Sequence, residues 1–249
     1  MRVGRARSTK HVQGGAARHR GAHCRTCDKP LLLLWTIDTS DKRFARVATA
    51  RRGPDANDAR ALSRFRKLSL LPIYYCWRCV GDLSYRLVSP KTIEIYKHHG
   101  QQQGEDFPYL DYPDSFPEVP LILEPIPAHL DARVRVRAVE DHWESDDEWR
   151  DLTRELGFKT TERWRLSTAR QVGGLPPLLQ GFELHTCQNP KCSHHNDDSS
   201  SEPMRILATI HETKDLPMIT EDVSYACGVQ VIAYICAVCH SLTVINRCD

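Results

Sequence analysis

The 249-residue sequence predicts a β-rich α+β fold made of two similar halves, with mixed or antiparallel sheets and peripheral helices. Three observations predict it. Apolar runs of strand length recur along the chain, cysteine pairs adjoin these runs, and the same order of pairs and runs occurs twice. The expected segments are a disordered basic tail (1–23), a first half (24–125), a connector strand and helix (126–170) and a second half (171–249).

The second half shows the pattern most clearly. Its cysteine pairs are Cys187/Cys192 and Cys236/Cys239, and the runs MRILATIHE and VQVIAYI lie between them. A further run, SLTVI, follows the second pair. Continuous apolar runs of this length are typical of buried strands. We therefore expect a cysteine knuckle, two buried strands, a second knuckle and a third strand.

The first half repeats this order. Cys24 and Cys27 precede LLLLWTID, whereas Cys76 and Cys79 follow LLPIYY and precede the strand-like run Leu83–Val88. The repetition indicates an internal duplication of a unit that resembles a zinc ribbon, with a long excursion in each copy.

Four thiolates in each half can close a tetrahedral shell around zinc, at about 2.3 Å from each sulfur. Two C-x-x-C-like pairs in one unit indicate a metal site far more strongly than a single pair does. The sequence therefore predicts two structural zinc sites, with the eight ligands Cys24, Cys27, Cys76, Cys79, Cys187, Cys192, Cys236 and Cys239. Disulfides, redox pairs and buried thiols remain alternatives, and His194, His195 or His240 could replace a thiolate.

Targeting signals and the distribution of charge narrow the range of expected functions further. No apolar signal segment follows the basic N-terminus and no apolar run approaches eighteen residues, so we expect a cytoplasmic protein without a membrane span. Residues 1–80 hold 18 basic and 5 acidic residues, a balance of +13 in a chain whose net charge is +2. Such asymmetry suits RNA or an acidic protein surface equally.

The remaining elements follow from local patterns. Proline-rich residues 98–127 predict an irregular segment, because proline removes ladder donors. Alternation and capping signals predict the other elements. They are strands at Phe44–Ala50, Thr92–Lys97 and Arg133–Val139, and helices at about 55–67 and 145–156.

Gly173-Gly174-Leu175-Pro176-Pro177 and Gln180, followed by the knuckle and the two strands, resemble the YwqG-like bacterial proteins. The same core is similar to the domain of eukaryotic programmed cell death protein 2. The resemblance covers 171–249 clearly and 24–97 by internal symmetry; no GG-x-P motif precedes Cys24. It implies a β-rich fold of two similar halves. It also implies a bacterial protein whose eukaryotic relatives handle ribosomal proteins during ribosome biogenesis.

No catalytic constellation appears in the sequence, since it has no phosphate-cradling loop with a lysine, nucleophile elbow or helical His-Glu-x-x-His. A closed shell of four thiolates also suits structural zinc. We therefore expect a non-enzymatic protein-binding module, chaperone-like or immunity-like, for which a basic or ribosomal protein is a candidate partner. The alternatives are an RNA-binding or ribosome-biogenesis factor that uses the basic N-terminal half, and a thiol redox enzyme.

Overall fold

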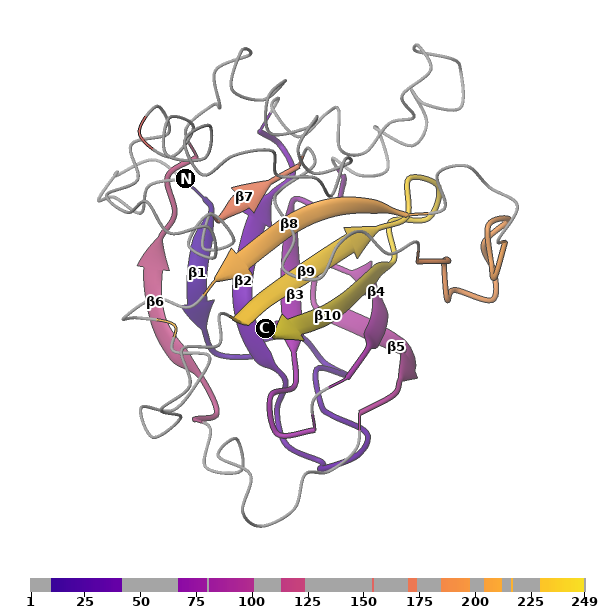
Figure 1. Cartoon of the computed structure of the whole chain (residues 1–249), viewed down its shortest axis with the longest axis horizontal. Coiled ribbons are helices and arrows are strands. Elements are labelled where there is room, and N and C mark those ends of the chain that lie inside the picture. The colour runs from indigo at the N-terminus through magenta and orange to yellow at the C-terminus, as the bar shows by residue number, and fades with distance from the viewer. Residues whose placement is uncertain are drawn as a thin grey trace.

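Two antiparallel sheets form the framework of the protein in a computed structural model. The structure describes residues 10–41, 67–79, 81–100, 113–123, 154, 170–173, 185–197, 204–211, 216 and 229–248. The first sheet has the order β3-β2-β1-β6 and the second the order β5-β4-β10-β9-β8-β7 (Figure 1). The strands are β1 Val12–Gly15, β2 Leu32–Asp38, β3 Leu70–Tyr75, β4 Leu83–Ser89, β5 Thr92–His98, β6 Phe116–Pro120, β7 Gln171–Val172, β8 Arg205–His211, β9 Val229–Ile235 and β10 Leu242–Cys248.

The hydrophobic core joins the two sheets. One cluster of buried side chains includes Trp35 and Ile73 from the first sheet together with Tyr85, Val231 and Val244 from the second. In Figure 1 the orange and yellow strands β8–β10 accordingly cross in front of β2 and β3. Strands β2 and β9 are buried on both faces, so their sequences are continuous apolar runs rather than alternating apolar and polar residues.

All ten secondary-structure elements assigned within the described residues are strands. The strands expected from LLLLWTID, LLPIYY, Leu83–Val88, Thr92–Lys97, MRILATIHE, VQVIAYI and SLTVI are all present. The expected helices lie outside the described residues apart from Lys67 and Arg154, and the strands expected at Phe44–Ala50 and Arg133–Val139 lie wholly outside them. The proline-rich segment contributes β6, which is an edge strand, the position in a sheet where proline is tolerated.

The prediction that residues 1–23 form a disordered tail is wrong for residues 12–15. These residues form β1, which pairs with β2 on one side and with β6 on the other. His11 beside the strand is buried, and its Nδ1 accepts a hydrogen bond of 3.0 Å from the backbone N–H of Asp38. The segment has few apolar side chains, but it supplies the backbone partners that two neighbouring strands need.

Gly14 explains how β1 can approach β6 so closely. Its φ of +72° lies in the left-handed region, and a Cβ at this position would overlap the carbonyl group of Pro117. Glycine alone meets both conditions without strain. The register of the β1–β6 pair shifts between Gln13 and Gly15, around this residue.

We expect Gly14→Ala to lower the free energy of unfolding by about 3 kcal/mol, because the new Cβ strains the backbone and pushes β6 away. Urea denaturation would measure the loss. Ala16→Gly, at an exposed position two residues along, is the control and should cost about 1 kcal/mol at most. Equal stability of Gly14→Ala and the parent would contradict the close packing of β1 on β6.

The duplication extends beyond the cysteines to the register of the strands. The pairing of β2 with β3 shifts between Leu33 and Trp35, and the pairing of β8 with β9 shifts between Ile206 and Ala208. Counted from these irregularities, every later pair of β2–β3 has a counterpart in β8–β9. Strand β1 runs beside β2 as β7 runs beside β8; β1 ends in Gly14-Gly15, and Gly173-Gly174 follows β7 in the sequence. Residues 12–15 are thus the counterpart of residues 171–174, although no proline follows.

The two halves differ in where the strand after the second knuckle goes. In the second half β10 returns to pair with β9, whereas in the first half β4 leaves β3 and pairs with β10. Tyr85 on β4 occupies the open edge of β3, where its hydroxyl donates to the carbonyl of Pro72 and accepts from the backbone N–H of Tyr74, both at 2.8 Å. The halves therefore share the six-stranded sheet.

Candidate metal centres

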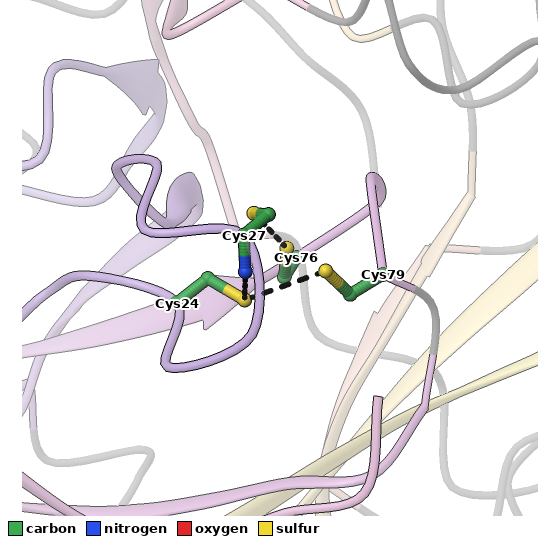
Figure 2. Close-up of side chains that lie close together, drawn as sticks. All are labelled: Cys24, Cys27, Cys76 and Cys79. Carbon is green, nitrogen blue, oxygen red and sulfur yellow. Dashed lines mark hydrogen bonds between the residues drawn. The ribbon is translucent and has the colours of Figure 1, made fainter. Parts of the chain in front are cut away.

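The first cysteine set comprises Cys24, Cys27, Cys76 and Cys79, and Figure 2 shows their four sulfurs gathered between two loops. Cys24 and Cys27 lie before β2, whereas Cys76 and Cys79 follow β3, which pairs with β2. Antiparallel pairing brings the start of one strand beside the end of the other, so the two knuckles meet. The Sγ atoms of Cys24 and Cys79 are 3.6 Å apart, and those of Cys27 and Cys76 are 3.8 Å apart.

The backbone around Cys24 folds into a tight knuckle. The N–H groups of Thr26 and Cys27 point at the sulfur of Cys24, at 3.4 and 3.5 Å. The N–H of Asp28 donates to the carbonyl of Cys24, and Asp28 has a φ of 54°. Backbone N–H groups directed at a sulfur stabilise the negative charge of a thiolate.

The second cysteine set comprises Cys187, Cys192, Cys236 and Cys239, and all four are buried. The sulfurs of Cys187 and Cys239 are 3.5 Å apart, and those of Cys192 and Cys236 are 3.8 Å apart. The C-x-x-C knuckle repeats the geometry around Cys24, since the N–H of His240 donates to the carbonyl of Cys236 and His240 has a φ of 60°. The set packs in its own apolar cluster with Met204, Ile206, Ile232, Tyr234 and Ile245.

The sulfur spacing fits a tetrahedral metal shell. Zinc–sulfur bonds of about 2.3 Å give sulfur–sulfur edges of about 3.8 Å in a tetrahedron. The contacts of 3.5 to 3.8 Å in both sets match this edge. A disulfide needs about 2.05 Å between sulfurs, and all eight cysteines are free. Both sets could therefore hold a metal ion, which favours the metal interpretation over disulfides.

The electrostatics of both sets favour ionised sulfur at particular positions. Hydrogen bonding with Cys76 lowers the pKa of Cys24 to about 2. Hydrogen bonding with Cys192 lowers the pKa of Cys187 to about 7, and hydrogen bonding with Cys187 lowers the pKa of Cys239. Hydrogen bonding within the sets raises the pKa of Cys76, Cys192 and Cys236, and burial raises the pKa of Cys79 to about 12. Each set therefore holds both ionised and protonated thiols, and because thiolates are the metal-binding form, metal binding would release the remaining protons.

The three histidines considered as replacement ligands do not join either group of ligand atoms. Both groups consist of four cysteines. Nδ1 of His195 lies 3.1 Å from the carbonyl oxygen of Cys187, so this ring serves the backbone of the knuckle. His240 is buried, and its backbone N–H closes the turn that begins at Cys236. His194 contributes its backbone N–H to the sulfur of Cys192 at 3.4 Å.

Two polar side chains near the sulfurs were missed from the sequence. Nδ1 of His98, at the end of β5, lies 3.6 Å from the sulfur of Cys24. The hydroxyl oxygen of Ser241 lies 3.1 Å from the sulfurs of both Cys187 and Cys239. The position of Ser241 two residues after Cys239 is a signal that the sequence does carry. The sequence contains no such signal for His98, because only the pairing of β5 with β4 brings this residue to the site.

We expect Ser241→Ala to weaken metal binding at the second cysteine set by about 10- to 100-fold, because the buried hydroxyl can donate to a thiolate. Competition with a chromophoric chelator would measure the affinity. Ser84→Ala is the matched control, since the Ser84 hydroxyl is also buried but bonds to Thr243 at 2.8 Å. Unchanged affinity in Ser241→Ala would show that the hydroxyl plays no part in holding the metal.

The fold and its sites define a β-rich protein of two antiparallel sheets that carries two four-cysteine groups able to bind metal. No family model, curated protein or solved structure matches the chain. The described residues contain no helix that is long and apolar enough to cross a membrane.

Proposed function

We propose that this chain is a zinc-stabilised binding module for another protein, that it is not an enzyme, and that it works in the cytoplasm. The observation that carries the proposal is the pair of four-cysteine groups, each placed where two paired strands begin and end. Four sulfurs complete a tetrahedral shell, so a metal there would have no open position for a substrate. Such a metal holds strands together and leaves the surrounding surface free for recognition.

Zinc is the metal that the ligands favour. Four thiolates at tetrahedral spacing suit zinc or an iron–sulfur centre, whereas carboxylate-binding ions such as magnesium need oxygen ligands. Both sets are spaced for one metal ion rather than for a cluster, because their ligand atoms all lie within 4.8 Å of one another. Eight reduced thiols also suit the cytoplasm, where disulfides are rare.

The partner of such a module is proposed as a protein. Chaperone-like binding follows from the YwqG-like resemblance, and immunity-like binding suits a bacterial binding module equally well. RNA binding is the second candidate, because residues 1–80 carry most of the positive charge of the chain. A thiol redox enzyme, the third alternative, would need an exposed sulfur at its active site. Seven of the eight cysteines in the two sets are buried, which supports a structural role instead.

Affinity capture with and without nuclease tests the choice between protein and RNA. Tagged protein is recovered from its own cells under reducing conditions, and bound proteins are identified by mass spectrometry. We expect one or a few protein partners that persist after nuclease treatment. Loss of every partner on nuclease treatment, with RNA recovered from untreated samples, would overturn the protein-binding proposal in favour of RNA.

A further inference from the structure

A groove runs along β5, the edge strand of the six-stranded sheet. Residues 20–25 lie against this edge. The N–H of Arg20 donates to the carbonyl of Lys91 at 2.8 Å, and the N–H of Ile93 donates to the carbonyl of Arg20 at 2.9 Å. Gly21 makes the approach possible, because a Cβ there would overlap the carbonyl oxygen of Ile93. The groove between this segment and the strands has a volume of about 540 Å³.

The groove is built to receive an aliphatic side chain. Ile93 and Ile95 line it and are only 3% and 6% exposed, so each presents a small, fixed apolar surface at its floor. Val88 also lines it and is 48% exposed. Among the described residues, Leu70 is the other large apolar side chain that is exposed, and it lies on the other sheet. A solvent-exposed valine beside buried isoleucines is the kind of apolar patch that marks a binding site.

Positive charge surrounds this apolar surface. Residues 18–29 and 86–97 together hold seven Lys/Arg and two Asp/Glu, a balance of +5. Glu94 lies directly opposite Arg86 in the β4–β5 register, so one of the two acids faces a cation. Arg20, Arg25 and Lys91 are exposed near the groove. A field of this sign attracts acidic groups and fixes their orientation.

The groove fits a peptide better than a nucleic acid. Single-stranded RNA is held by stacking its bases on aromatic rings. The groove is lined by eight residues, which include no phenylalanine, tyrosine or tryptophan: Gly21, His23, Arg25, Val88, Thr92, Ile93, Glu94 and Ile95. Aliphatic side chains offer a pocket for a leucine, isoleucine or valine, and no platform for a base.

We propose that the groove between residues 21–25 and β5 binds an extended segment of a partner protein in which acidic residues flank one aliphatic side chain. This inference rests on the proposed function and names the surface that serves it. The positive charge around the groove favours an acidic segment over the basic partner that the family resemblance implies. The aliphatic side chain contacts Ile93, Ile95 and Val88. The flanking carboxylates lie near Arg25 and the neighbouring cations. A guanidinium nitrogen of Arg25 already donates to the carbonyl of Ile95 at 2.6 Å.

Fluorescence anisotropy with labelled synthetic peptides tests the proposal on the full chain. The probe is DEDLEDE. DEDGEDE lacks the apolar side chain, KRKLKRK reverses the charge, and labelled oligouridylate of the same length represents RNA. Val88→Asp places a charge in the groove, and Leu70→Asp makes the same change at the exposed leucine of β3. Metal content is measured for both variants, so that a failure of the metal-stabilised fold is seen separately from a failure of the groove.

We expect the parent to bind DEDLEDE at least tenfold more tightly than either peptide control. Val88→Asp should weaken this binding at least tenfold, while Leu70→Asp keeps the parent affinity. If DEDLEDE does not bind to metal-loaded protein, or if both variants bind it equally, the proposal is overturned although the metal sites stand. Preferential binding of oligouridylate that Val88→Asp weakens would overturn it in favour of RNA.

Discussion

Replacement of Cys236 by serine should disrupt the second cysteine set and unfold the six-stranded sheet beside it. Cys236 is fully buried at the end of β9, which lies between β8 and β10 in the six-stranded sheet. A serine would leave three thiolates and a hydroxyl that cannot close the shell. Structural zinc contributes on the order of 10 kcal/mol in small zinc domains, which is comparable with the net stability of a whole domain. The rest of the fold cannot absorb such a loss.

Limited proteolysis and chelator-induced unfolding would measure the effect of Cys236→Ser. Cys227→Ser and Cys248→Ser are the matched controls, because these two cysteines belong to neither set. They should cost about 1–2 kcal/mol at most. If Cys236→Ser resists protease as well as the parent does, the second set does not support the fold.

Removal of β1 should have the second largest effect. A chain that begins at residue 16 lacks the strand that separates β2 from β6, so the four-stranded sheet loses its continuity. It also loses the contact of His11 Nδ1 with the backbone of Asp38. With about 0.5–1.5 kcal/mol net for each hydrogen bond, the loss of two ladders costs on the order of 5 kcal/mol.

The comparison chain begins at Lys10, the first described residue, and keeps β1 intact. Thermal unfolding followed by circular dichroism would compare the two chains. The difference between them isolates the contribution of residues 10–15. Equal melting temperatures would mean that the N-terminal segment is a dispensable tail, as its composition alone suggests.

The sequence predicted the apolar strands that lie within the described residues and the membership of the two four-cysteine groups, because both are local signals. Apolar runs such as LLLLWTID mark buried strands wherever they pair, and each cysteine pair precedes or follows one along the chain. Once two such strands pair in antiparallel fashion, the knuckles must meet. The composition of the sets therefore follows from the chain order without knowledge of the rest of the fold.

The parts that the sequence did not predict depend on long-range pairing. Strand β1 is polar and rich in glycine, so its hydrophobicity predicts a tail, yet its backbone completes a sheet between β2 and β6. Pairing of β4 with β10 crosses from one half to the other, and no local pattern distinguishes it from pairing with β3. His98 reaches Cys24 only through the register of β5 on β4.

We propose that two metal ions hold this fold together, and metal analysis of the purified chain tests this most directly. The protein is prepared under reducing conditions and dialysed extensively, and its zinc is counted by mass spectrometry. We expect close to two zinc ions per chain, because two complete sets of four thiolates are present. A value near zero in reduced protein that remains folded would contradict the account.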